Sequence, residues 1–331
     1  MDSTVLPEFR DVEAAASRIA GRAFETPLLE NAALNRTLGR RVLLKLESLQ
    51  RTGSFKIRGA TNRIALIPET ERAKGVVAFS SGNHAQGVAA AAGQFGIPAT
   101  IVMPADAPRA KLEGTKALGA RIVFYDRAKD DREAIAAAIA EASSATLIRP
   151  FDDPGIIAGQ ATAGLELIRQ ASASGATLES VLVPCGGGGL VSGIALALSQ
   201  ASPSTKVFSV EPENFDGMRR SLASGKRVSA PGGATSIADA LMSPAPGHLP
   251  FALAAKLGAM GLVVNDRELA AGVAYAAGTL KLIIEPGGSA GLSAALAGHA
   301  PSGEGALGIV VSGGNCDLEM LEDCISRTAQ P

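Results

Sequence analysis

The stretch Gly53-Ser54-Phe55-Lys56-Ile57-Arg58-Gly59-Ala60 sets one lysine among small residues, soon after the apolar segment Val42 to Glu47, whose composition predicts a β-strand. Apolar residues recur at roughly helical spacing beyond Lys56, which predicts a junction of strand, loop and helix at this lysine. Most lysines are solvated surface charges, so this stretch alone does not make Lys56 a reactive group. The other motifs of the chain decide between the two interpretations.

Strands and helices alternate along most of the chain, which predicts an α/β protein built on parallel strands with helices on both faces. A first amphipathic helix is predicted from Pro7 to Arg22, and an irregular connection from Ala230 to Pro250. The predicted strands span residues 76–79, 99–103, 121–125, 146–149, 180–184, 206–210, 262–264 and 307–311. Because no linker is visible, a division into two domains has to come from the order of the strands.

The composition favours a small molecule as the partner of this protein. The 331 residues include 31 basic and 32 acidic side chains, a balance that offers no field for nucleic acid or for an anionic membrane. Three scattered cysteines provide neither a disulfide framework nor a zinc cage. The amino-terminal segment has no secretory pattern and no window of 18 apolar residues occurs, so a cytoplasmic protein is expected.

A run of glycines, Gly186, Gly187, Gly188 and Gly189, follows one predicted strand and opens a helix. Backbone N–H groups and the helix dipole can hold a phosphate at such a place, and this interpretation is favoured over a flexible turn, because a turn rarely needs four consecutive glycines. A dinucleotide site is an alternative, because Glu211 lies 22 residues after Gly189, where such folds carry a ribose-binding acid. The glycine spacing, however, is not G-x-G-x-x-G.

Two further polar motifs follow predicted strands. Ser80-Ser81-Gly82-Asn83-His84 offers hydroxyl, amide and imidazole groups at a helix start, either as a receptor for a carboxylate or as a helix cap. Ser312-Gly313-Gly314-Asn315 is either a plain turn or part of a site. Both motifs and the glycine run lie at the carboxyl ends of strands, where open parallel sheets bind ligands. The three histidines lack metal-ligand spacing.

Taken together, these motifs resemble the fold-type II pyridoxal-phosphate enzymes, the threonine/serine dehydratases most of all, with serine racemase as a relative. The resemblance runs from about Asp11 to Asp317 and includes Phe151-Asp152-Asp153-Pro154 and Ile157-Ala158-Gly159-Gln160. It implies two open, mostly parallel twisted sheets flanked by helices, with pyridoxal 5'-phosphate in the cleft between them. Residues 1–47 and 151–331 would form a large cofactor-binding domain, and residues 48–150 a small domain carrying the loop from Ser80 to His84.

The resemblance also implies a role for each cofactor-binding residue. Lys56 would attach the cofactor aldehyde covalently, Phe55 would pack beside the ring, and Asn83 would hydrogen-bond the ring hydroxyl. Ser312 would face the pyridine nitrogen, where a neutral partner favours elimination over transamination. The phosphate would be bound by the backbone amides of Gly186, Gly187, Gly188 and Gly189.

The substrate carboxylate would be held by Ser80, Ser81, Asn83 and His84. The two catalytic residues would be Lys56, which removes the α-proton, and Ser81 on the opposite face of the ring. The implied reaction is β-elimination from L-threonine or L-serine, which gives 2-oxobutyrate or pyruvate and ammonia. A homodimer or homotetramer of the short catabolic type, without a regulatory domain, is expected.

Several alternatives remain at this point. Serine racemisation, or dehydration or racemisation of hydroxyaspartate, would use the same site. A nicotinamide oxidoreductase would use the glycine run with Glu211, and a binding protein would keep the fold without turnover. In the racemase branch, a divalent cation is held by a glutamate matching Glu211 and by a carboxylate six residues later, but this chain has Gly217 there, with Asp216 one place away. We therefore predict no metal ligands, with a divalent or monovalent cation as the alternative. Ala240 stands where many relatives carry glycine.

Overall fold

The computed structural model describes residues 5–80, 82–107, 109–231 and 233–329. Its strands form a six-stranded sheet in the order β1-β2-β10-β7-β8-β9 and a four-stranded sheet in the order β5-β4-β3-β6. The larger sheet consists of β1 (Leu28–Glu30), β2 (Val42–Leu46), β10 (Ala306–Val311), β7 (Leu178–Pro184), β8 (Lys206–Pro212) and β9 (Met260–Val264). The smaller sheet consists of β5 (Arg121–Tyr125), β4 (Ala99–Pro104), β3 (Val76–Phe79) and β6 (Thr146–Leu147).

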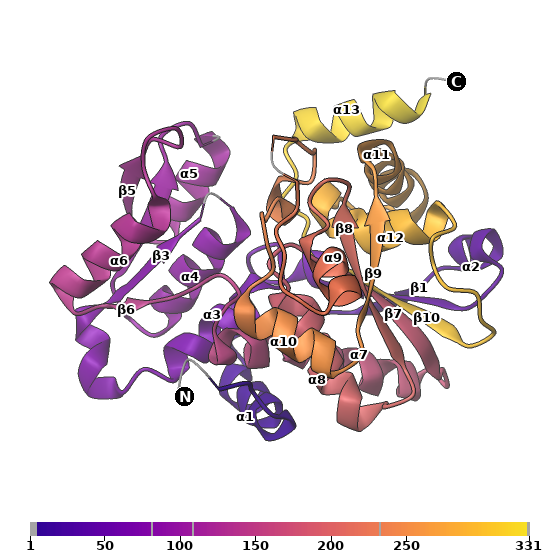
Figure 1. The fold of residues 1–331 in the computed structure, drawn as a ribbon, viewed down its shortest axis with the longest axis horizontal. Helices are drawn as coiled ribbons and strands as arrows, with labels where there is room; N and C mark the ends of the chain where they lie inside the picture. Colours follow the sequence, from indigo (N-terminus) through magenta and orange to yellow (C-terminus); the bar gives the residue numbers. More distant parts are fainter. Residues whose placement is uncertain (1–4, 81, 108, 232, 330–331) are drawn as a thin grey trace.

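The predicted fold class, with two mostly parallel sheets flanked by helices, is confirmed. β1 runs antiparallel to β2, whereas the other pairs of neighbouring strands are parallel. The smaller sheet and its helices form the left part of Figure 1, and the larger sheet with the carboxyl-terminal helices forms the right part. Strands β2, β3 and β10 are buried along their whole length, because helices cover both faces of each sheet.

The helices mostly follow the predicted alternation. They are α1 (Phe9–Ile19), α2 (Ala32–Leu38), α3 (Lys56–Ala65), α4 (Asn83–Gln94), α5 (Arg109–Ala117), α6 (Arg132–Ser143), α7 (Pro154–Ala173), α8 (Gly189–Ala201), α9 (Gly217–Ser224), α10 (His248–Lys256), α11 (Asp266–Tyr275), α12 (Pro286–Leu296) and α13 (Leu318–Ala329). Short helical turns span Glu47–Leu49 (η1), Glu69–Lys74 (η2), Asp239–Leu241 (η3) and Ala276–Leu280 (η4). The sequence did not predict β1, α2 and α9, since each is too short for a clear periodicity.

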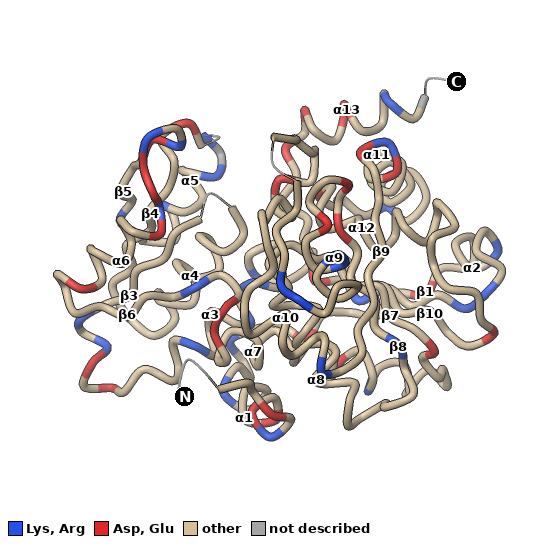
Figure 2. Tube along the Cα trace, in the orientation of Figure 1, with Lys and Arg blue, Asp and Glu red and all other residues tan. Residues whose placement is uncertain are grey.

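Charged residues of both signs are mixed along the chain, as Figure 2 shows for both parts of the molecule. This distribution agrees with the balanced composition. Within the described ranges, no helix is long and apolar enough to cross a membrane.

Helices α3 and α7 join the two parts of the molecule. Where they cross, a Cβ atom on Gly159 would lie 2.6 Å from the Gly59 Cα atom and 2.7 Å from the Arg58 carbonyl oxygen. Glycine is therefore required, because any side chain there would force the helices apart. Helix α3 packs on α4 of the smaller part as well as on α7, and the division into two domains stays a prediction. The boundaries at 47/48 and 150/151 stay a prediction.

Replacing Gly159 by alanine tests this crossing. We expect Gly159→Ala to lower the free energy of unfolding by about 1–3 kcal/mol, because the added methyl group overpacks a backbone contact. Urea denaturation measures the loss. The control is Gly93→Ala on α4, where the nearest atom to a new Cβ would be the Leu118 carbonyl oxygen at 3.9 Å. An equal loss in both variants would contradict the close crossing.

Candidate active site

A cavity of about 580 Å³ lies at the carboxyl ends of strands from both sheets. This volume is in the usual range for a cofactor or small-molecule site. Residues that follow β3, β6, β7 and β10 line it, together with the first residues of α3 and α4. All predicted site residues in the described ranges line this one cavity: Phe55, Lys56, Ser80, Asn83, His84, Gly186, Gly187, Gly188, Gly189 and Ser312. Ser81 lies outside the described residues.

Lys56 is the first residue of α3, and backbone contacts fix its position. The Phe55 N–H group donates to the Ser312 carbonyl oxygen at 3.1 Å, and Ser54 forms an isolated antiparallel bridge with Gly313. The Lys56 ammonium donates to the Pro150 carbonyl oxygen at 3.0 Å. Burial disfavours the charged amine and lowers the pKa of Lys56 to about 8, although nearby Glu285 opposes this shift. Roughly a tenth to a fifth of the lysine is therefore neutral near physiological pH, far more than for an ordinary lysine.

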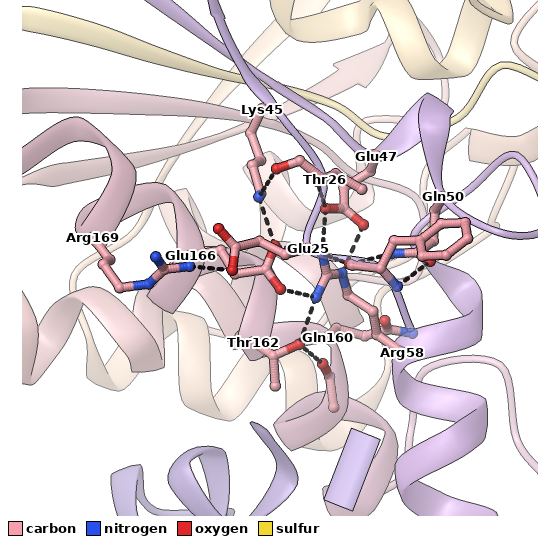
Figure 3. A network of polar contacts seen from close by, with 12 residues as sticks. Glu25, Thr26, Lys45, Glu47, Gln50, Arg58, Gln160, Thr162, Glu166 and Arg169 are labelled. Carbon is pink, nitrogen blue, oxygen red and sulfur yellow. Dashed lines mark hydrogen bonds and ion pairs between the residues drawn. The ribbon is translucent and has the colours of Figure 1, made fainter. Parts of the chain in front are cut away.

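Arg58, two residues beyond Lys56, is held in a buried cluster of charges (Figure 3). Its guanidinium makes paired hydrogen bonds with both carboxylate oxygens of Glu47, at 2.7 and 2.8 Å, and of Glu166, at 2.6 and 2.7 Å. Lys45 also donates to Glu166 at 2.6 Å. Burial alone would raise the pKa of Glu47, but Arg58 outweighs burial and holds this pKa below its usual range. The cluster ties β2, η1, α3 and α7 together close to the reactive lysine.

The glycine run packs closely against the wall of the cavity. A Cβ atom on Gly187 would overlap the Phe151 ring, and one on Gly189 would lie 3.0 Å from the Phe151 Cβ atom. Gly188 has a φ of +92°, which favours glycine, and precedes the first turn of α8. The N–H groups in the first turn of a helix have no partners within that helix. The run is therefore a close-fitting cradle at a helix start, suited to a phosphate group.

The segment around Ser80 and His84 binds its own backbone just before α4 and also provides polar groups to the wall of the cavity. The Ser80 hydroxyl accepts a hydrogen bond from the Gly82 N–H group at 3.1 Å. His84 is buried, and its Nε2 atom lies 3.0 Å from the Ile148 carbonyl oxygen. Burial and the nearby charge of Lys56 lower the pKa of His84 to about 3, so the ring is neutral. Since a carbonyl oxygen only accepts, Nε2 carries the proton and Nδ1 keeps a lone pair.

Of two further residues of the cavity region, Glu285 was not singled out from the sequence, and Asp152 was quoted only within the motif Phe151 to Pro154, without a role. Glu285, which the sequence indicated only as part of a turn before α12, accepts a hydrogen bond from the Asn83 amide at 2.6 Å and lines the cavity. Asp152 accepts hydrogen bonds from the backbone N–H groups of His248 and Leu249, at 3.1 and 2.8 Å, and so caps α10 from a distant part of the chain. The hydrogen-bond partners of Glu285 and Asp152 are remote in sequence, so no local pattern could have identified these contacts.

Glu211 caps the start of α9. Its side chain is buried and accepts hydrogen bonds from the backbone N–H groups of Met218 at 2.8 Å and Arg219 at 2.7 Å, at the start of α9. Asp216 pairs with Arg219 and Arg220. Among the described residues, no group of three or more histidine, cysteine, aspartate or glutamate side chains could hold a metal ion.

Ala240, which stands where many relatives carry glycine, lines the cavity.

These residues fit pyridoxal phosphate. A neutral lysine amine can bind an aldehyde covalently, and the glycine cradle can accept a phosphate that a Cβ atom would exclude. The Ser312 side chain is buried at the cavity wall, and Asn83 presents an amide on the same cavity.

Comparisons with known proteins agree with this fit. The family model described as "Pyridoxal-phosphate dependent enzyme" matches residues 19–313. A serine racemase from Schizosaccharomyces pombe is 39% identical over 326 residues, with 98% of this chain and 99% of the relative covered. An L-threo-3-hydroxyaspartate ammonia-lyase from Pseudomonas sp. is 42% identical over 315 residues, with 95% and 97% covered.

A solved structure of a threonine deaminase from T.th. superposes with a TM-score of 0.88 at 41% identity, covering 94% of this chain and 99% of that one. The family, fold and cofactor predicted from the sequence motifs are thereby confirmed, and the nicotinamide alternative is not supported. The chain belongs to the pyridoxal-phosphate-dependent enzymes.

Proposed function

We propose that this enzyme catalyses β-elimination of water from L-threonine and L-serine, followed by hydrolysis that releases ammonia, so that the net products are ammonia and 2-oxobutyrate or pyruvate. One observation carries the proposal: the Lys56 amine, with its pKa lowered to about 8, shares a cavity with the glycine cradle and with Ser312. When bound, pyridoxal phosphate supplies an electron sink for the carbon next to the amino group. Relatives named as a threonine deaminase and an ammonia-lyase support this reaction class.

In this proposal the residues of the chain divide the work. Gly186, Gly187, Gly188 and Gly189 would bind the phosphate, while Phe55 would pack beside the ring. Asn83 would donate to the ring hydroxyl, and Ser312 would be the neutral partner of the ring nitrogen. Each of these residues lines the same cavity.

Lys56 holds the cofactor covalently and, once released by the incoming amino group, takes the α-proton on its Nζ atom. Ser80, Ser81, Asn83 and His84 hold the substrate carboxylate at the start of α4, where the helix dipole favours an anion. The neutral His84 ring contributes hydrogen bonding and no charge. Ser81 is assigned from the family motif alone.

A second candidate substrate is L-threo-3-hydroxyaspartate, which would give oxaloacetate and ammonia. Two cavity cations already have carboxylate partners: Lys111 pairs with Asp239 at 2.7 Å and Arg149 with Glu133 at 2.9 Å. Arg132 and Arg227 also line the cavity, and neither has an ion pair within the described ranges. Arg227 donates to the Pro246 carbonyl oxygen at 2.6 Å, whereas the Arg132 guanidinium lies 5.8 Å from the centre of the Phe79 ring. Because Phe79 precedes the proposed carboxylate loop, Arg132 is placed to bind a second carboxylate.

Two other expectations stay predictions: the homodimer or homotetramer and the cytoplasmic location. Racemisation of serine on the same site is tested below together with elimination.

A panel of amino acids tests the reaction. We expect L-threonine, L-serine or L-threo-3-hydroxyaspartate to release ammonia together with the matching 2-oxo acid, measured by coupled reduction of the oxo acid. Chiral chromatography measures D-serine in parallel. D-serine formed much faster than pyruvate would contradict the assignment as an ammonia-lyase and favour the racemase alternative.

Arg132→Met tests recognition of the second carboxylate. We expect kcat/KM for L-threo-3-hydroxyaspartate to fall about tenfold or more, because a charge-assisted hydrogen bond is lost, while kcat/KM for L-threonine stays within about threefold. The control is Arg127→Met, which removes a surface arginine that pairs with Asp106 at 2.7 Å. Equal losses on both substrates would argue against this role.

The pH dependence of cofactor attachment tests Lys56. Only the neutral amine attacks an aldehyde, so the rate at which the apoenzyme binds pyridoxal phosphate covalently should rise with pH and level off above about 8. An ordinary lysine would show a rise up to about 10.4. Borohydride reduction followed by mass spectrometry measures the attachment, and Lys56→Ala should show none at this position. A rate that keeps rising to about pH 10 would refute the lowered pKa.

A further inference from the structure

We propose that Glu285 is a positioning residue, which fixes the side-chain amide of Asn83 so that one of its N–H groups is available to the ring oxygen of the cofactor. Three side chains and one backbone carbonyl group carry this inference. They come from segments far apart in the sequence: the loop before Lys56, the start of α4, the start of α12, and the loop after β10.

The orientation of the Asn315 and Asn83 amides follows from a chain of hydrogen bonds. The chain starts at a backbone carbonyl oxygen, which can only accept. The Thr52 carbonyl oxygen can only accept, so the Asn315 atom 2.9 Å from it is the amide nitrogen, Nδ2. The same nitrogen lies 2.7 Å from Asn83, which must therefore turn its oxygen toward Asn315. This leaves the Asn83 nitrogen on the other side, where it donates to Glu285 at 2.6 Å.

A primary amide nitrogen carries two hydrogens, and Glu285 takes only one of them. The second N–H group of Asn83 is free for an acceptor in the cavity, which Asn83 and Glu285 both line. Without the carboxylate, the hydrogen bond from Asn315 alone would hold the amide, and a rotation that breaks this bond would present the Asn83 oxygen to the cofactor instead. Two oxygens would then face each other, and the hydrogen bond would be lost.

The backbone is built to admit this carboxylate. Glu285 is the residue before α12, its N–H group donates to the Gly313 carbonyl oxygen at 3.2 Å, and only 6% of its surface is exposed. A Cβ atom on Gly313 would overlap the Glu285 Oε1 atom, so glycine at 313 makes room for it. Gly53, with a φ of +69°, makes room for the Asn315 amide in the same way. Two glycines thus accommodate the two groups that orient Asn83.

The charge of Glu285 is balanced within the same region. Burial raises the pKa of Glu285 to about 7, while the Asn83 hydrogen bond, Lys111 and Lys56 favour the ionised form against Asp239. The carboxylate is therefore present at and above neutral pH. An ionised acceptor holds an amide more strongly than a neutral one does.

The test measures how the apoenzyme binds pyridoxal phosphate, without any amino-acid substrate. Fluorescence titration gives the dissociation constant, and the visible absorption of the bound cofactor reports on the hydrogen bonding of its ring oxygen. Glu285→Ala should weaken binding about tenfold or more and shift the absorption, because it frees the Asn83 amide. Glu285→Asp should act in the same direction, since it keeps the charge but withdraws the carboxylate from Asn83. The two variants also guard against a failure of either one to fold.

A double-mutant cycle separates positioning from a merely structural effect. If Glu285 acts through Asn83, then Glu285→Ala or Glu285→Asp should cause no further loss of cofactor affinity in an Asn83→Ala background. The control for damage to α12 is Ser289→Ala, one turn further along, which should leave affinity within about threefold of the wild type.

Fully additive losses in the cycle, or an unchanged affinity and spectrum in a folded Glu285→Ala or Glu285→Asp variant, would overturn the proposal. The result depends only on the cofactor. The proposed reaction on threonine and serine can therefore fail while this inference stands, and the reverse also holds.

Discussion

The paired hydrogen bonds of Arg58 with Glu47 and Glu166 are the constraint on which the rest of the site depends (Figure 3). Both carboxylates bind one guanidinium whose exposure is 0%, and Lys45 brings the cluster to a balance of two positive and two negative charges. Removing one member of such a cluster would leave a buried charge without compensation, which is far more costly than the net gain from forming it. The cluster therefore favours one arrangement of α3 over its alternatives.

This arrangement matters because Lys56 is only two residues from Arg58. The close crossing at Gly59 and Gly159 fixes how near α3 lies to α7. The bridge between Ser54 and Gly313 fixes the backbone just before Lys56. A Cβ atom on Gly87 would lie 3.1 Å from the Lys56 carbonyl carbon, so α4 closes the remaining side. Helices α3, α4 and α7 and the segment after β10 together fix the position of Lys56.

The sequence could predict those features that rest on local patterns. The alternation of strands and helices predicted the parallel strands, and the glycine run and the Ser80 to His84 motif identified the cavity walls. Glu285 and the partners of Arg58 could not be found this way, since their importance comes from burial and from residues 11 to 202 positions away. Gly187 illustrates the difference: the sequence favoured phosphate binding there, but only the Phe151 ring explains why no side chain fits.

Burial acts on the three titratable groups nearest the proposed chemistry in the same sense, by favouring the neutral form of each. It lowers the pKa of Lys56 to about 8 and of His84 to about 3, and raises the pKa of Glu285 to about 7. These shifts give each of the three groups a larger neutral fraction than it would have in water, and the phosphate and carboxylate groups of the ligands would meet backbone N–H groups at helix starts. Burial thus outweighs the opposing effect of Glu285 and leaves part of the Lys56 amine neutral, which is the form that can accept a proton.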